Sequence, residues 1–265
     1  PTQAERLHAL ERGAQRSLKL GWTQIQYAGT SWDEVDLLCQ LDAAGKLKLR
    51  VYVAIDGPGK DAERLLDEGP AAPRCGDRVS VRAIKVYIDG ALGSRGAALF
   101  SAYADAPETT GLLLNDAQTL MPIFTRALER GIQIQTHAIG DRGNRLVLDL
   151  YQRAFETVRT DRRAVKEPRW RIEHAQVLTR EDISRFAKLG VIASMQPSHA
   201  IGDLFFAPQR LGEDRLAGAY AWRSLLDAGA TIAAGSDAPV EQGDPRIEFY
   251  AAVARKSLDG YADEN

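Results

Sequence analysis

Cysteine and long hydrophobic runs are both scarce in this sequence. Only Cys39 and Cys75 occur among its 265 residues, with no CxxC spacing, so we expect two reduced structural thiols rather than a disulfide or a zinc knuckle. No apolar stretch approaches the roughly 18 residues that a membrane-spanning helix needs. Residues 1–20 are charged and amphipathic and lack the apolar centre of a signal peptide. These absences predict a cytoplasmic protein with no membrane partner.

An excess of charge of either sign is also missing. The chain carries 34 basic and 36 acidic residues, for a formal net charge of −2. No run of Lys and Arg is interleaved with aromatic residues, as a nucleic-acid-binding surface would require. We therefore expect a small-molecule substrate as the partner and no nucleic acid, and the sequence leaves a homo-oligomer open.

The sequence does contain alternating strand and helix patterns. With 45% hydrophobic and 26% charged residues, its composition is that of an ordinary globular protein with one large core. Helix signals lie between most of the apolar runs, such as the capping box formed by Ser31 and Glu34 and the helix start and stop at Thr179 and Gly190. Seven short apolar runs predict strands at residues 22–29, 48–56, 82–90, 132–140, 169–177, 191–199 and 231–240.

This alternation predicts a parallel sheet with helical crossovers. A doubly wound sheet would place its ligand at the ends of a few strands, whereas a (β/α)₈ barrel places functional groups at the ends of many. Polar residues fall in or at the end of five different predicted strands, which favours the barrel: Lys85, His137, His174, His199 and Asp237. We therefore predict an α/β fold of the (β/α)₈ type, with about seven of eight strands in a single domain spanning 1–265.

Three strand histidines and one aspartate suggest metal chemistry. One buried imidazole alone is as consistent with a core residue as with a ligand. Several imidazoles and a carboxylate converging from separate strands form a donor set that suits zinc or a similar divalent ion. Asp237 could then transfer a proton from water to a leaving group, which makes hydrolysis the natural reaction class. Lys85 would be either an ammonium paired with Asp89 or Asp237, or a carboxylate formed with CO₂.

Four motifs of this sequence together resemble those of a known protein family: "RAIKVYIDGALGSRGAAL", "IQTHAIGDRGNRLVLD", "RWRIEHAQVLTREDISRFAKLGVIASMQPSH" and "GSDAPVEQGDPRIEFYAAVAR". From about Arg6 through Arg255 the chain resembles the amidohydrolase superfamily, in particular the branch that includes N-substituted formamide deformylases. The resemblance implies one or two divalent ions, with zinc as the expected metal, and a catalytic role for Asp237. The implied metal ligands are Lys85, which is often carboxylated in such enzymes, His137, His174 and Asp237. The implied substrate-binding residues are Asp89, Gly90, Arg95, Gln196 and His199, the last of which could also contact the metal.

Two features depart from that superfamily. Its members begin the barrel with a strand carrying an HxH pair of metal ligands, and they have a small β-rich domain built from both chain ends. Neither is present here, so we expect the barrel to be incomplete at both ends and the segment alone to be a weak or inactive hydrolase. Glu173, which precedes His174, is expected to be structural and paired with Arg171 or a helix cation.

Three functions follow from these residues. The first is hydrolysis of a C–N bond, in an amide or N-substituted formamide-like group, by a metal-activated water. The second is a barrel that binds a small molecule without turnover. The third is a metal-free lyase or aldolase in which Lys85 forms a Schiff base.

Overall fold

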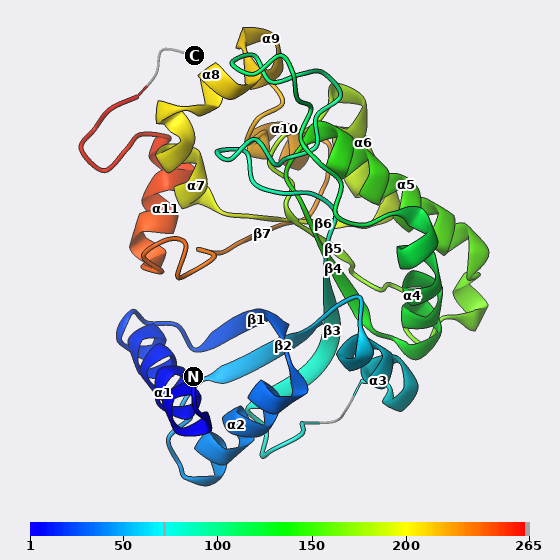
Figure 1. Ribbon diagram of the computed structural model, residues 1–265, viewed down its shortest axis with the longest axis vertical. Helices are drawn as coiled ribbons and strands as arrows, with labels where there is room; N and C mark the ends of the chain where they lie inside the picture. The colour runs from blue at the N-terminus through cyan, green and yellow to red at the C-terminus, as the bar shows by residue number, and fades with distance from the viewer. Residues whose placement is uncertain (71–72, 263–265) are drawn as a thin grey trace. The chain divides into compact units, whose positions relative to one another are not determined.

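The strands form one sheet in chain order in the computed structural model, which describes residues 1–70 and 73–262 (Figure 1). They are β1 (Gln24–Thr30), β2 (Arg50–Asp56), β3 (Val79–Tyr87), β4 (Gln133–Ala138), β5 (Arg171–His174), β6 (Ile192–Met195) and β7 (Ile232–Ala234). Strand β1 pairs in parallel with β2, β2 with β3, β5 with β6, and β6 with β7. Sequential strands with helical crossovers are the arrangement of a (β/α)₈ barrel, here with seven strands. The predicted fold class is confirmed.

Helices occupy most of the connections between strands. They are α1 (Gln3–Lys19), α2 (Trp32–Ala43), α3 (Lys60–Glu68), α4 (Ala117–Arg130), α5 (Asp141–Thr157), α6 (Arg180–Leu189), α7 (Pro197–Gly202), α8 (Ala207–Leu211), α9 (Glu213–Leu216), α10 (Trp222–Asp227) and α11 (Pro245–Ala254). The predicted capping box of Ser31 and Glu34 begins α2, and Thr179 and left-handed Gly190 begin and end α6. Within the described ranges, no helix is both long and apolar enough to cross a membrane.

The chain divides into two compact units, of which the first carries β1, β2 and most of β3. It consists of Pro1–Val86, Ile123–Gln135 and Val158–Pro168. Val53 and Val81, which are partners in the β2–β3 register, are fully buried, as expected for strands covered on both faces. The single domain predicted from the sequence stays a prediction.

The second unit consists of Tyr87–Pro122, Thr136–Thr157 and Arg169–Asn265. Its core joins the segment that follows β3 to the helices after β6, through Leu92, Leu99, Tyr103, Ala200 and Leu211. The Tyr103 hydroxyl donates to the Ala97 carbonyl at 2.8 Å, so this buried ring also has its polar atom satisfied. The long segment after β3 therefore packs against the rest of the second unit through a hydrophobic core.

Cys39 and Cys75 form a disulfide, with their Cα atoms 5.3 Å apart. The expectation of two reduced thiols is therefore wrong. The segment of Cys75 folds back against α2, where Arg78 pairs with Asp42 at 3.2 Å. A separation of 36 residues along the chain carries no information on such proximity. Because Cys39 and Cys75 are not free thiols, they give no support for a reducing compartment. The cytoplasmic location stays a prediction.

Candidate active site

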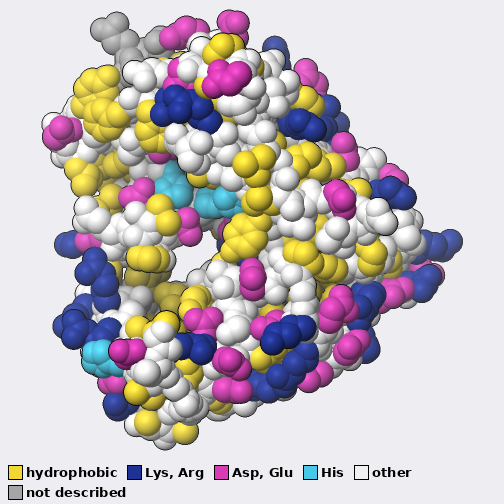
Figure 2. Space-filling model, viewed as in Figure 1, with side chains coloured by type: hydrophobic (Ala, Val, Ile, Leu, Met, Phe, Trp, Pro, Cys, Tyr) yellow, Lys and Arg dark blue, Asp and Glu magenta, His cyan; other side chains and the backbone are white. Residues whose placement is uncertain are grey.

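His137 and His174 lie against each other at the ends of β4 and β5. Their ring centroids are 4.6 Å apart and their planes meet edge to face at 73°. His174 has φ +76°, a left-handed backbone that non-glycine residues rarely adopt and that is concentrated at functional sites. Figure 2 shows histidine side chains side by side on this face of the molecule. The structure therefore brings together two of the four predicted metal ligands.

Gln196 orients the His174 ring. The Nδ1 atom of His174 lies 2.7 Å from Gln196 Oε1, and an amide oxygen can only accept, so the proton is assigned to Nδ1. The Nε2 atom of Gln196 donates to the Ser194 carbonyl at 3.2 Å, which holds the amide in this orientation. In this tautomer, Nε2 of His174 is the unprotonated nitrogen, the form in which a neutral imidazole binds a metal. Gln196, predicted to bind substrate, contacts a predicted metal ligand.

Asp89 organises the turn after β4. Its carboxylate accepts hydrogen bonds from the backbone N–H groups of Ala98 at 2.9 Å, Ile139 at 3.0 Å and Gly140 at 2.8 Å. The side chain is fully buried, and its Oδ1 lies 3.6 Å from His137 Nε2. Burial raises the pKa of Asp89 to about 7, against the three N–H donors that favour the charged form. Its role in substrate binding stays a prediction, and its observed contacts are with the loop backbone and His137.

Gly90 and Arg95 lie in the tight turn that follows Asp89. The Gly90 N–H donates to the Gly96 carbonyl at 3.1 Å, and a Cβ on Gly90 would lie 3.1 Å from the Gly96 backbone. Arg95 has φ +58° and a bidentate pair with Asp105, at 3.0 Å from Nε and 2.8 Å from Nη2. Arg95 is thus engaged by a carboxylate of the protein, and its predicted contact with substrate is not tested.

His199 does not end a strand, as the sequence pattern predicted. Strand β6 stops at Met195, and Pro197 begins the short helix α7, because proline supplies no N–H for a sheet and suits the first turn of a helix. His199 lies in this helix with its ring stacked on that of His174, at 5.7 Å between centroids and 16° between planes. The interpretation of residues 191–199 as one strand is corrected to a strand followed by a helix.

Two carboxylates face the buried edge of His199. Its Nε2 atom is 4.0 Å from Asp237 Oδ2 and 3.7 Å from Glu241 Oε1. This atom is buried, and no hydrogen-bond partner for it is found among the described residues. Burial lowers the pKa of His199 to about 4, so the ring is neutral near pH 7. A neutral imidazole between two carboxylates can exchange a proton with either.

Asp237 is the third residue after β7 and has φ +54°. Its side chain is 44% exposed, so this carboxylate is not sealed in a core. Glu241, four residues later, was missed in the sequence, because nothing in "PVEQGD" distinguishes it from other loop carboxylates. Burial is the main cause that raises the pKa of Glu241, and the negative charges of Glu248, Asp203 and Asp237 add to it.

Lys85 lies in the first unit, on β3, and is 5% exposed. It is in register with Asp56 of β2. Burial raises the pKa of Asp56, and the positive charge of Lys85 offsets part of that rise. A buried lysine beside an acidic neighbour is compatible both with a paired ammonium and with a modified amine, so its predicted role as a ligand stays a prediction.

Glu173 forms the pair expected from the sequence. Arg171 Nε lies 2.7 Å from its Oε1, and Nη2 lies 2.9 Å from its Oε2. Arg171 Nη2 also donates to Ser194 Oγ, so the pair links β5 to β6. Glu173 is therefore a structural residue, as predicted.

The chemically active side chains of the second unit form two pairs joined by the stacked His174 and His199 rings. His137 lies with His174, and His199 lies with Asp237. Over the described part of the chain, no group of three or more His, Cys, Asp or Glu side chains is arranged to hold a metal ion. A metal bound in this site would need a further ligand. That ligand would be either a side chain of another residue type or the Asp237 carboxylate in a shifted position.

Two relatives are considerably longer than the region that matches this chain. YtcJ of Bacillus subtilis is 35% identical over 216 residues, which cover 81% of this chain and 38% of YtcJ. The N-substituted formamide deformylase of Arthrobacter pascens is 25% identical over 249 residues, or 92% of this chain and 44% of the deformylase. The chain thus spans less than half the length of these relatives.

The structure is similar to that of an uncharacterized metal-dependent hydrolase from Pyrococcus horikoshii. The TM-score is 0.84 at 27% sequence identity, over 96% of this chain and 49% of the other. The four motifs resemble those of amidohydrolases, and the match of almost the whole sequence to that family confirms this resemblance. Residues 1–264 match the amidohydrolase family, and the chain belongs to that family.

Proposed function

We propose that this chain carries metal-binding histidines and the proton-transfer carboxylate of a metal-dependent hydrolase. The bond cleaved would be a C–N bond in an amide or an N-substituted formamide-like substrate. Two similarities support this proposal: the Pyrococcus horikoshii protein is described as an uncharacterized metal-dependent hydrolase, and the Arthrobacter pascens relative is an N-substituted formamide deformylase. The observation that carries it is the 4.6 Å His137–His174 pair, with the His174 tautomer set by Gln196.

These residues fit a divalent metal by the chemistry of their donors. His174 presents an unprotonated Nε2 in the assigned tautomer, and its Nδ1–H is held by an amide oxygen, the type of outer partner that metal-binding histidines use. His137 lies beside it, and its Nε2 faces the Asp89 carboxylate at 3.6 Å and the Gly90 carbonyl at 3.5 Å. Imidazole nitrogens of this kind suit zinc, which is the metal we propose.

A divalent metal held by these histidines would lower the pKa of a water molecule toward about 7 and polarise the substrate carbonyl. Asp237 would accept a proton from the attacking water and deliver it to the nitrogen as the C–N bond breaks. The C–N bond would thus break with the nitrogen as a neutral amine, which can take up a further proton at pH 7. His199, neutral and 4.0 Å from Asp237, would lie beside that carboxylate. Lys85, His137, His174 and Asp237 remain the proposed ligand set.

A small-molecule-binding protein without turnover is the second candidate. It is favoured by the arrangement of the described His, Cys, Asp and Glu side chains, of which no three are placed to hold a metal. Metal binding and turnover, measured on the same sample, separate the two candidates.

The test is a zinc titration followed by an assay. The full chain, stripped with a chelator, is titrated with Zn²⁺ in parallel with His137→Ala, His174→Ala and the control His8→Ala, whose side chain is exposed on α1. We expect the two site variants to bind Zn²⁺ at least about tenfold more weakly and the control to be unchanged. Hydrolysis of N-substituted formamides and simple amides should be lost on chelation and restored by Zn²⁺. Equal affinity in all four proteins would refute the metal site, and binding without turnover would favour the second candidate.

A further inference from the structure

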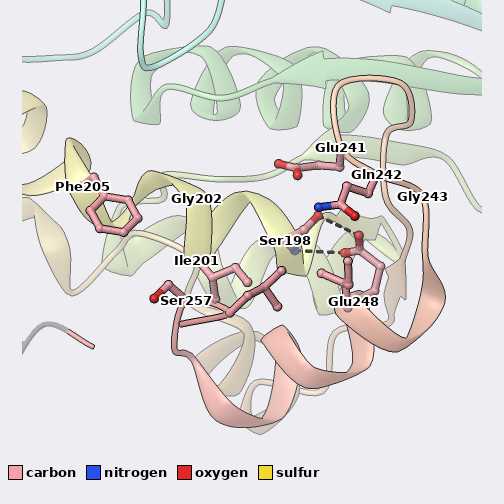
Figure 3. Close-up of a pocket in the computed structure, with 11 residues that line it drawn as sticks. Ser198, Ile201, Gly202, Phe205, Glu241, Gln242, Gly243, Glu248 and Ser257 are labelled. Atoms are coloured by element: carbon pink, nitrogen blue, oxygen red, sulfur yellow. Dashed lines mark hydrogen bonds between the residues drawn. The ribbon is translucent and has the colours of Figure 1, made fainter. Parts of the chain in front are cut away.

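A cavity of about 200 Å³ lies beside α7, α11 and the loop 241–243 (Figure 3). Part of its lining is apolar and comes from Ile201, Phe205, Ile247 and Leu258. Phe205 and Leu258 are each 58% exposed, so the apolar wall continues to the surface, where Figure 2 shows hydrophobic side chains gathered. The volume is below the roughly 300 Å³ at which sites for drug-sized ligands begin. The cavity therefore suits a small apolar group rather than a whole large substrate.

The lining of the cavity also includes two carboxylates. Glu248 is 6% exposed and accepts hydrogen bonds from Ser198, at 2.9 Å from the N–H and 2.7 Å from Oγ, as the dashed lines in Figure 3 show. Glu241, from the loop after Asp237, lines the same cavity. The described residues that line it include no Lys, Arg or His. An apolar body with a cationic or hydrogen-donating end complements such a lining, whereas an anion would be repelled.

Glu241 connects this cavity to the candidate active site. Its Oε1 lies 3.7 Å from His199 Nε2, and that nitrogen lies 4.0 Å from Asp237. Both carboxylates thus lie within 4.0 Å of one ring nitrogen, so a group seated in the cavity against Glu241 would lie beside the candidate active site. The cavity is placed to hold one end of a substrate whose cleaved bond lies near Asp237.

The charges of the two products decide which half of the substrate this is. Hydrolysis of an amide gives a carboxylic acid, which is an anion at neutral pH, and an amine, which takes up a proton to become a cation. A carboxylate beside Glu241 and Glu248 would meet two like charges, and an ammonium would be paired. Resting on the proposed C–N hydrolysis, we propose that the cavity is the subsite for the nitrogen-bearing half of the substrate, a primary amine with a small apolar substituent, held by Glu241.

The test is direct binding of three matched compounds: cyclohexylamine, cyclohexanol and cyclohexanecarboxylate. Calorimetric titrations of the full chain are run at pH 7 with a chelator present, so that neither turnover nor a metal contributes. We expect cyclohexylamine to bind at least about tenfold more tightly than cyclohexanol, and cyclohexanecarboxylate most weakly. Equal binding of amine and alcohol, or tighter binding of the carboxylate, would overturn the proposal.

Two variants locate the binding. Glu241→Gln keeps the shape and removes the charge, and should reduce the amine's affinity to that of the alcohol, whereas Glu213→Gln, at an exposed carboxylate on α9, should change nothing. Leu258→Lys places a cation at the exposed rim and should weaken amine binding several-fold without lowering the unfolding temperature. Unchanged amine binding in both cavity variants would overturn the subsite even if the protein hydrolyses amides. Amine binding that depends on Glu241 would uphold the subsite even if the zinc assay fails.

Discussion

The Nδ1 atom of His174 lies 2.7 Å from the amide oxygen of Gln196, and the amide nitrogen of Gln196 is held by the Ser194 carbonyl. This pair of hydrogen bonds fixes both the orientation and the tautomer of the imidazole. Residues that hold a metal-binding histidine in this way commonly contribute tenfold to a hundredfold in metal affinity. The family resemblance implies that Gln196 binds substrate. Its contact with His174 leads us to expect instead that it acts on the metal site through that histidine.

Replacing Gln196 by Leu should weaken Zn²⁺ binding by about tenfold or more, because Nδ1 loses its acceptor and the ring is no longer held in one tautomer. Gln196→Glu should restore most of the affinity, since a carboxylate oxygen accepts the same hydrogen bond. Zinc titration of the stripped protein measures both variants. Gln118→Leu, at an exposed position on α4, is the matched control. A Leu variant with wild-type affinity would show that Gln196 has no part in the metal site.

Gly143 on α5 is required by its contact with Asp89. A Cβ at this position would lie 2.5 Å from Asp89 Oδ2 and 2.9 Å from its Cγ, closer than van der Waals contact allows. Gly143→Ala should therefore lower the free energy of unfolding by about 2 kcal/mol, as is usual for overpacking a buried site. Gly13→Ala on α1, where a Cβ would have nothing within 4 Å, should instead raise it by about 0.5–1 kcal/mol through helix propensity. Urea denaturation of the two variants tests this opposite pair of effects.

The strands were predictable because each is a short apolar run between turn or helix signals. His137 and His174 were placed correctly because a strand pattern leads into each residue. His199 was misplaced because the apolar pattern continues into α7, and only the helix-starting effect of Pro197 separates the two elements. The pairing of Arg171 with Glu173 followed from strand alternation.

Other features of the site depend on contacts that sequence spacing does not carry. Glu241 reaches His199 across 42 positions of chain, and the Cys39–Cys75 bond spans 36. The family resemblance implies a substrate-binding role for Asp89. Its hydrogen bonds to the backbone of Ala98, Ile139 and Gly140, however, depend on how the long segment after β3 packs. The side-chain partners of a residue are set by this packing, whereas the sequence patterns report only each residue's own element.

Asp203 should make stability depend on pH. Burial raises its pKa from 3.8 to about 6, and hydrogen bonds from Tyr220 and Gln176 offset part of this rise. Between these two pKa values the folded protein holds a proton that the unfolded chain releases. The free energy of unfolding should therefore fall by about 2 kcal/mol as the pH rises from about 4 to about 7.

The Asp203→Asn variant should lack this contribution, because an amide does not titrate. Urea denaturation at several pH values would show the difference between wild type and variant shrinking as the pH is lowered from about 7 to about 4, because Asp203 becomes protonated in both states of the wild type at low pH. Asp214→Asn, at an exposed position on α9, should follow the wild-type curve. A constant difference across this range would mean that Asp203 titrates normally.

The last prediction is that the buried amine of Lys85 is carboxylated by CO₂. Lys85 is 5% exposed, and a lysine reacts with CO₂ through its neutral amine, the form that burial in general favours. Protein equilibrated with ¹³C-bicarbonate should then show a carbamate resonance by NMR that is absent from Lys85→Met and retained in Lys46→Met, where the replaced lysine is exposed and paired with Glu11. The alternative is an ammonium paired with its register neighbour Asp56. That arrangement gives no carbamate signal at any bicarbonate concentration.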